Sequence, residues 1–131
     1  STVDLDQTLE LFIALTARFA AMRGVKVELQ LSASPLRIPT APYYLLNLLW
    51  LCLDFCMSAS GDEKRVELVV EEAENSVRIR FQRLAGLSAA LAETFPSDRE
   101  KILLAVLEAV LTAEPERAEV VLRLSKNNGV N

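Results

Sequence analysis

The most apolar stretch of this 131-residue chain covers residues 41–59, and it limits the folds that the chain can adopt. Asn47 and Asp54 interrupt this stretch. A membrane-spanning helix needs roughly 20 mostly apolar residues, so the interruptions favour a buried helix of a globular domain. Pro42 suits the first turn of a helix, where no amide hydrogen is needed. We therefore predict a central helix that is apolar nearly all round and ends near Ser58.

The segments on either side of this helix carry two different hydrophobic periods. Apolar residues at helical spacing predict a first helix over residues 6–23, capped by Asp4 or Asp6 and ended by Gly24. Alternating apolar and polar residues predict strands. They cover residues 25–31, 66–70, 77–81 and 120–124, and the second and third of them form a hairpin. Residues 3–5 and 36–38 are expected to be short extended pieces.

The segment before the last strand predicts two further helices. The first covers residues 87–95 and stops at Pro96, and the second continues to about Ala113. Ser97 and Glu100 have the spacing of a capping box at the start of the second helix. Helices and strands mixed in this order predict an α/β (α+β) two-layer sandwich, with a mixed, mostly antiparallel sheet packed against helices. We expect one domain over residues 1–126 and a disordered tail over residues 127–131.

Composition excludes several classes of function. The net charge is −4, which argues against nucleic-acid binding and against contact with an anionic membrane surface. Histidine is absent, which removes the usual general base and the commonest metal ligand. Cys52 and Cys56 are interpreted as buried small hydrophobes rather than a metal or redox pair. We expect a cytoplasmic protein without a bound metal.

Several strings resemble the histidine kinase-like ATPase domain, also called the GHKL or Bergerat fold, and the resemblance covers nearly the whole chain. Residues 3–31 are similar to the first strand, helix and second strand of a histidine kinase catalytic domain, including the opening Val-Asp-Leu and the Arg-Gly before the strand. The family's N box is commonly written N-L-L-x-N-A-x-K-F/Y. Residues 47–55 read N-L-L-W-L-C-L-D-F, so Asn47, both leucines and Phe55 coincide with it.

The same resemblance implies that the residues that hold ATP are missing. Leu51 stands where the family has the asparagine that helps to hold magnesium, and Asp54 stands at the lysine position. Arg83 stands where the aspartate of the D-x-G-x-G box reads adenine, and Gly86 is the only glycine that survives in the corresponding string, residues 81–87. Residues 87–101, where the family has a glycine-rich ATP lid, contain no glycine, so the resemblance implies that the lid is missing or replaced by a short helix. We interpret Asn47, Leu51, Asp54, Phe55, Arg83 and Gly86 as vestigial nucleotide-pocket positions.

Three chemical requirements for ATP binding fail together at these positions. Magnesium needs oxygen ligands, and Leu51 has none. An arginine has no acceptor for the adenine amino group. Close backbone approach to phosphate needs glycine, and the chain has no G-x-G. At 4 Å, Asp54 would repel a phosphate charge by about 1 kcal/mol in water and about 4 kcal/mol at an effective dielectric of 20. We therefore predict no ATP, no other cofactor and no catalytic residue.

The leading hypothesis is a non-catalytic pseudokinase module of two-component or phosphorelay signalling. The resemblance implies a response-regulator receiver domain as partner, and a homodimer formed through an upstream helical hairpin that the present sequence lacks. One alternative is an active sensor kinase domain with unusual ATP contacts. Another is a structural or dimerising domain whose old cleft is filled by Leu51, Phe55 and Leu84.

The aromatic residues and the first asparagine of the central helix invite functional interpretation as well. Trp50 and the pair Tyr43 and Tyr44 are interpreted as core and rim residues rather than as a ligand platform. Asn47 is expected to be a buried amide that needs partners, either as a remnant of the pocket or as a structural hydrogen bonder.

Overall fold

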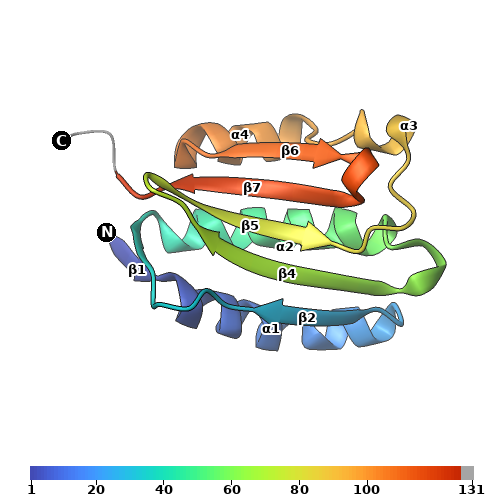
Figure 1. Ribbon diagram of the computed structural model, residues 1–131, viewed down its shortest axis with the longest axis horizontal. Coiled ribbons are helices and arrows are strands. Elements are labelled where there is room, and N and C mark those ends of the chain that lie inside the picture. Colours follow the sequence, from blue (N-terminus) through green and yellow to red (C-terminus); the bar gives the residue numbers. More distant parts are fainter. Residues whose placement is uncertain (128–131) are drawn as a thin grey trace.

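In the computed structural model, which describes residues 1–127, three helices lie on one face of a five-stranded sheet (Figure 1). The helices are α1 (Leu5–Met22), α2 (Pro42–Ser58) and α4 (Asp98–Leu107). In sheet order, the strands are β2 (Lys26–Gln30), β4 (Arg65–Glu72), β5 (Ser76–Gln82), β7 (Glu119–Ser125) and β6 (Val110–Glu114). β2 and β4 are parallel, and the other neighbours are antiparallel. The predicted two-layer α/β sandwich with a mixed, mostly antiparallel sheet is confirmed.

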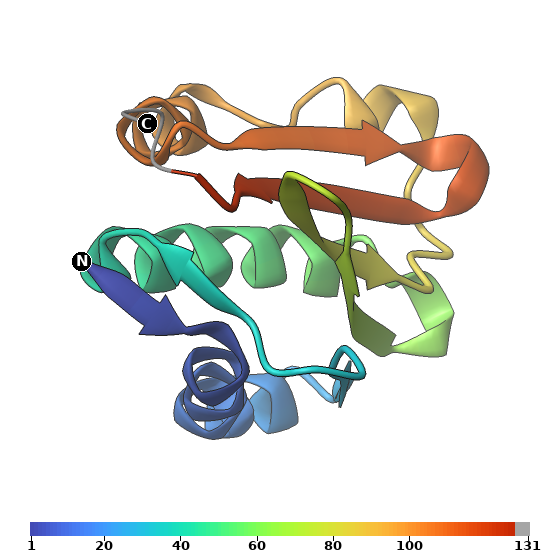
Figure 2. The same ribbon diagram turned by 60° about the vertical axis from the view of Figure 1, so that its left-hand side comes forward.

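A second, two-stranded sheet joins β1 (Thr2–Asp4) to β3 (Arg37–Pro39), and Figure 2 shows these strands side by side near the N-terminus. The predicted extended pieces are present here, but their antiparallel pairing was not predicted. Val3 lies opposite Ile38, and the Leu5 amide donates to the Leu36 carbonyl over 2.8 Å. Because the pairing is antiparallel, α1 begins at the end of this sheet near Leu36, and α2 begins at the other end, where the Thr40 amide donates to the Ser1 carbonyl.

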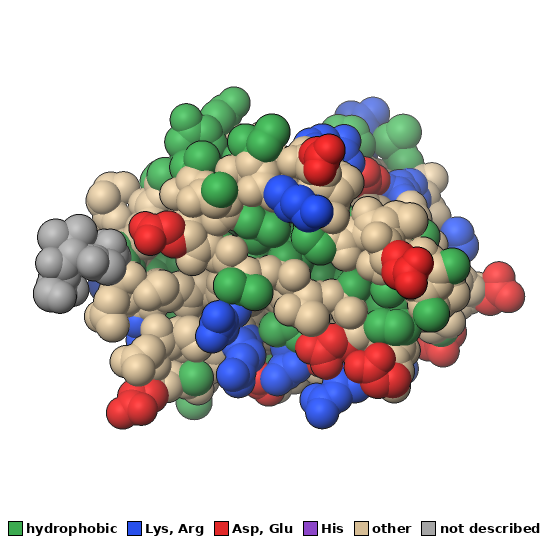
Figure 3. Space-filling view, turned by 90° about the horizontal axis from the view of Figure 1, so that it is seen from above, with side chains coloured by type: hydrophobic (Ala, Val, Ile, Leu, Met, Phe, Trp, Pro, Cys, Tyr) green, Lys and Arg blue, Asp and Glu red, His purple; other side chains and the backbone are tan. Residues whose placement is uncertain are grey.

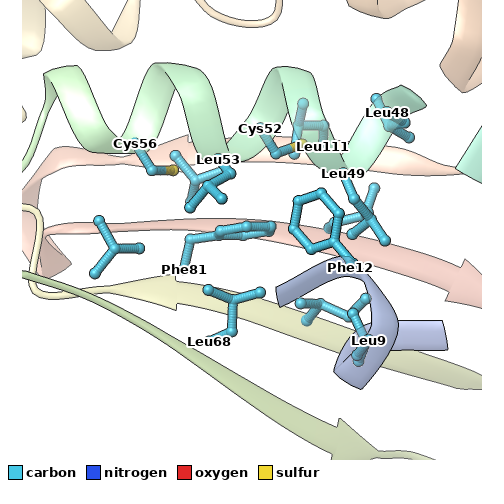
Figure 4. Close-up of a cluster of buried hydrophobic side chains, with 14 of the residues drawn as sticks. Leu9, Phe12, Leu48, Leu49, Cys52, Leu53, Cys56, Leu68, Phe81 and Leu111 are labelled. Atoms are coloured by element: carbon cyan, nitrogen blue, oxygen red, sulfur yellow. The ribbon is translucent and has the colours of Figure 1, made fainter. Parts of the chain in front are cut away.

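The two long helices form where the sequence predicts them. Asp4 caps α1 by accepting a hydrogen bond from the Gln7 amide, and Gly24 follows the helix with a φ of +69°. α2 lies at the centre of the core, and Figure 4 shows its side chains directed at the sheet around Phe81. Burial of each large apolar side chain contributes about 1.5–3 kcal/mol. The fully buried members of this cluster include Leu9, Leu49, Cys52, Leu53, Leu68 and Phe81.

The prediction that one helix continues to Ala113 was wrong. α4 ends at Leu107, because Glu108 adopts a left-handed conformation with φ of 52°. The chain then forms β6, in which Leu111 is buried opposite Leu122 while Val110 is exposed. The spacing of these apolar residues fits a helix as well as a strand, and pairing with β7 decides between them because it satisfies the backbone of the sheet.

The helix predicted over residues 87–95 is also shorter than expected. Only α3 (Ala89–Ala92) is helical, and it is capped by Ser88. Two 3₁₀ turns complete the described chain, at Gly61–Glu63 and Pro115–Arg117. None of the helices within residues 1–127 is long and apolar enough to cross a membrane.

The predicted disordered tail begins at the last described residue. Asn127 exchanges hydrogen bonds with the hydroxyl of Ser125. The other predicted tail positions, 128–131, lie outside the described residues.

Candidate functional site

The candidate site is the outward side of α2, where the few polar residues of this helix gather. Asn47, Asp54 and Ser58 share this side with Leu51, which is half-buried. Asn47 is exposed, and its side-chain amide donates to the Tyr43 carbonyl one turn earlier over 2.8 Å. The expectation of a buried amide was therefore wrong, because this side of α2 is not covered by another element at Asn47.

Asp54 is held by an arginine from the end of α1. Nη1 of Arg23 lies 2.5 Å from Oδ1 of Asp54, and Nη2 donates to the hydroxyl of Ser58 over 2.8 Å. The same Nη2 also contacts the Asp54 carbonyl at 3.3 Å. Both charged side chains are roughly one-third exposed, at 33% and 40%. The carboxylate that stands at the family's lysine position is therefore neutralised within the domain. This contact was not predicted, although Arg23 precedes the helix-ending glycine.

Phe55 closes the other edge of the site by stacking on Phe95. The two ring centroids are 4.1 Å apart and the planes are 5° from parallel. Phe95 is buried and belongs to the segment between α3 and α4, at the place where the resemblance expects a flexible lid. One of the alternative hypotheses has Phe55 help to fill the nucleotide cleft, but its partner was not predicted, because 40 residues separate the two rings. Sequence periodicity carries no signal for such a contact.

A depression of about 320 Å³ remains between α2 and the α3–α4 segment. This volume is at the low end of the range for small-molecule sites, about 300–1,000 Å³. Its lining mixes the stacked rings with hydroxyls, two acids and one arginine: Asp54, Phe55, Ser58, Leu91, Thr94, Phe95, Ser97, Arg99 and Glu100.

Glu100 anchors this lining through the predicted capping box, which is present at the start of α4. Its Oε1 accepts from the Ser97 amide at 2.7 Å and from the Ser97 hydroxyl at 2.6 Å, and its Oε2 accepts from Arg99 at 3.0 Å. Burial alone would raise the pKa of Glu100 and is the largest single influence. The hydrogen bonds from Ser97 and Arg99 together outweigh it, so the pKa lies below its ordinary value. The carboxylate therefore fixes the turn after Phe95.

The β5–α3 loop carries the other predicted positions. Arg83 is exposed and has a φ of 69°, and Leu84 beside it is fully buried, with its amide donating to the Ala118 carbonyl. The pKa of Glu28 on β2 is lowered, chiefly by its hydrogen bond from Arg65 and, among smaller influences, by the charge of Arg83. Arg83 is therefore within electrostatic reach of β2. Among the described residues, no hydrogen bond or ion pair joins Arg83 to Asp54.

Gly86 has a packing role that explains its presence without a nucleotide. Its amide donates to the Ala59 carbonyl over 2.8 Å. A Cβ atom at Gly86 would lie 3.0 Å from that carbonyl oxygen and 3.0 Å from the backbone nitrogen of Gly61. The loop after β5 therefore packs backbone to backbone against the turn after α2, and a side chain at this position would force the two apart.

The cysteine thiols and the possible metal ligands are the alternative sites of chemistry among residues 1–127. Cys52 and Cys56 are both free and fully buried in the core. Burial raises the pKa of each thiol well above its ordinary value, and this favours the unreactive protonated form. Within residues 1–127, no group of three or more histidine, cysteine, aspartate or glutamate side chains is arranged to hold a metal ion. Figure 3 shows acidic and basic side chains interspersed on the side formed by α4 and β6.

The chain has the fold of the catalytic ATP-binding domains of sensor histidine kinases. The nucleotide-free catalytic domain of the histidine kinase ThkA superimposes with a TM-score of 0.78 at 14% identity, over 96% of this chain and 95% of that one. The Acinetobacter baumannii histidine kinase AdeS gives a TM-score of 0.76 at 12% identity, over 98% of this chain and 68% of that one. No protein-family model matches the sequence, and no curated protein matches it.

Two further structures of the same fold are informative. The histidine kinase domain of the Escherichia coli osmosensor EnvZ gives a TM-score of 0.69 at 11% identity, over 100% of this chain and 90% of that one. ThkA in complex with the response regulator protein TrrA gives a TM-score of 0.78 at 12% identity, over 100% of this chain and 43% of that one. At these identities the likeness establishes the fold, and it confirms the resemblance found in the sequence.

Proposed function

We propose that this chain is a non-catalytic histidine kinase-like domain that serves two-component or phosphorelay signalling as a protein-docking module and does not bind ATP. The proposal rests on the contacts that the side chains on the outward side of α2 make within the domain. Leu51 offers no ligand there, Asp54 is paired with Arg23, and Phe55 is stacked on Phe95. Two free cysteines fit the cytoplasmic setting that the proposal includes.

The chemistry of Mg-ATP supports the absence of nucleotide binding. Magnesium requires near-octahedral oxygen coordination, and the one carboxylate on this side of α2 already accepts a charged hydrogen bond from Arg23. A nucleotide ring placed between α2 and the lid segment would have to separate Phe55 from Phe95. Gly86 is committed to its contact with Gly61 rather than open to a phosphate group.

A response-regulator receiver domain is the partner we propose. The support is a shared fold: ThkA has this fold and has been solved in complex with the response regulator protein TrrA. Docking requires a complementary surface and no nucleotide chemistry, so the features that argue against ATP leave this role intact.

Isothermal titration tests the docking role. A receiver domain encoded in the same operon should bind with a dissociation constant on the order of micromolar, as transient signalling contacts of modest area do. A receiver domain from an unrelated operon, titrated in the same buffer, is the matched control and should bind at least about tenfold more weakly. Equal binding of both receivers, or binding of neither, would contradict the proposal.

The second candidate function is an active kinase domain with unusual ATP contacts. The exposed amide of Asn47 favours it, because this residue coincides with the first asparagine of the N box and remains accessible on α2. Direct titration with Mg-ATP distinguishes the two candidates.

A further inference from the structure

No helix within residues 1–127 covers the outer face of the five-stranded sheet, onto which Figure 1 looks. On β4 and β5, buried apolar residues alternate with half-buried, mostly polar ones, and the polar side chains point to this outer face. Three cations of the face have carboxylate partners: Arg80 with Glu71 and Glu119, Arg65 with Glu28, and Lys26 with Glu28. Opposite charges paired in this way stabilise a sheet, so the fold explains their presence.

Two further arginines of the outer face form a like-charge pair. Arg78 on β5 lies directly opposite Arg123 on β7. Directly opposite residues of antiparallel strands have Cβ atoms about 4.5–5.5 Å apart, and like charges at this position destabilise the sheet. Arg123 is exposed, whereas Arg78 is half-buried. The stability of the fold therefore does not explain this arginine pair, which we define as Arg78 and Arg123.

The carboxylates near the arginine pair do not compensate it. Neither arginine forms an ion pair within residues 1–127. Glu71 lies opposite Arg78 on β4, but its carboxylate accepts from Nε of Arg80 over 2.7 Å. Glu108 borders the same depression as Arg123 without forming an ion pair with it. Two guanidinium groups thus remain side by side and available to an anion from outside the described chain.

The surroundings of the pair favour a carboxylate from a partner protein as this anion. The depression beside Arg123 has a volume of about 240 Å³. It is smaller than the roughly 300–1,000 Å³ of small-molecule sites, so it suits one inserted side chain. Val110 lies opposite Arg123 on β6 and is 45% exposed, which offers an apolar contact to a protein surface. The flanking Glu71 and Glu108 and the net charge of −4 would repel an extended polyanion such as nucleic acid.

We propose that the arginine pair binds an acidic segment of a partner protein on the outer face of the sheet. A carboxylate of that segment accepts hydrogen bonds from both guanidinium groups, which removes their mutual repulsion. An adjacent apolar side chain of the segment contacts Val110. This proposal goes beyond the docking role proposed above, because it fixes the surface and the chemistry of the partner and does not require that partner to be a receiver domain.

A double-mutant cycle with Arg78→Gln and Arg123→Gln tests whether the two arginines repel each other in the isolated chain. Urea denaturation gives the equilibrium constant for folding of each variant. The effect of Arg123→Gln on this constant should be more favourable in the wild type than in Arg78→Gln, by roughly two- to fivefold. A coupling that is attractive or absent would show that the fold accommodates both charges by itself, and it would overturn the proposal.

Titration of the isotope-labelled chain with a hexaglutamate peptide, followed by amide chemical shifts, tests the binding. Shifts should saturate, concentrate at residues 76–80 and 121–125, and weaken as salt is added. Arg78→Gln and Arg123→Gln should each raise the dissociation constant at least about threefold. Arg18→Gln is the matched control, because Arg18 is exposed on α1 and also forms no ion pair within residues 1–127. It should leave the dissociation constant unchanged.

Two further probes separate the acidic segment from other occupants. A hexaglutamine peptide, which has the same length without the charge, should not bind. Inorganic phosphate at equal ionic strength should bind more weakly than hexaglutamate, because it reaches only one point of the face. Phosphate that binds the same amides as tightly as the peptide would assign the pair to a small anion and overturn the proposal. An absence of saturable peptide binding, or an equal effect of Arg18→Gln, would overturn it as well.

Discussion

The two flanks of α2 are both aromatic, but the rings stack face to face on only one of them, which we call the closed flank although a depression of about 320 Å³ borders it. On the flank towards α3 and α4, Phe55 stacks on Phe95 at 4.1 Å and the following turn is fixed by Glu100. On the flank towards α1, Phe19 and Trp50 border an open apolar groove. The family resemblance places the nucleotide beside the first flank. The difference shows that the rings of α2 pack closely against the α3–α4 segment, whereas those on the flank towards α1 leave apolar surface exposed.

The largest difference between the flanks should appear in the free energy of unfolding. Phe95→Ala should lower it by about 3–5 kcal/mol, because a buried stacked ring is removed. Phe19→Ala should lower it by about 1 kcal/mol or less, because that ring is half-exposed. Urea denaturation at the lowest usable protein concentration, where association contributes nothing, measures both. Equal losses in the free energy of unfolding would contradict the difference between the two flanks.

The next largest effect concerns the carboxylate that fixes the closed flank. Glu100→Gln should lower the free energy of unfolding at neutral pH by about 1.5–3 kcal/mol, since charged hydrogen bonds are lost. The pKa of Glu100 is lower in the folded state than its ordinary value of 4.5. Its contribution is therefore complete above pH 4.5 and is lost as the pH falls towards the folded-state pKa.

Denaturation curves between pH 7 and about pH 3 should show this loss in the wild type and a smaller loss in Glu100→Gln. If the stability of Glu100→Gln declines with acid as steeply as that of the wild type, the ionised Glu100 carboxylate does not stabilise the closed flank.

The smallest effect is expected where Arg23 crosses from α1 to α2. A double-mutant cycle with Arg23→Met and Asp54→Asn should give a coupling energy of about 0.5–1 kcal/mol, because both groups are partly exposed and screened by solvent. Raising the salt concentration should reduce this coupling. A coupling near zero would mean that Asp54 remains available to a ligand, and the contrast between the flanks would then rest on the aromatic rings alone.

The elements with a strong period could be predicted from the sequence, and the features decided by distant contacts could not. α1, α2 and the alternating strands β4, β5 and β7 lie close to their expected positions. β6 was missed because Val110 and Leu111 fit a helix as well as a strand, and pairing with β7 decides between the two. The stack on Phe95 and the pairing of Asp54 with Arg23 join segments far apart in the chain, which no local pattern encodes.

The candidate site shows the same division between local and distant information. The apolar stretch placed Asn47, Leu51, Asp54 and Phe55 on one helix, and the resemblance to the N box marked them as candidate site residues. Whether those side chains face solvent, an ion pair or another ring depends on elements that follow or precede them by dozens of residues. The exposed position of Asn47 is the clearest example, since its apolar sequence neighbours indicated burial.

Titration calorimetry with Mg-ATP tests the central claim most directly. A catalytically competent histidine kinase domain in the same buffer serves as the positive control. We expect no saturable binding by this chain up to millimolar nucleotide, because the side of α2 that would hold magnesium and phosphate presents leucine, a paired carboxylate and a stacked ring. A dissociation constant below about 1 mM would contradict the account.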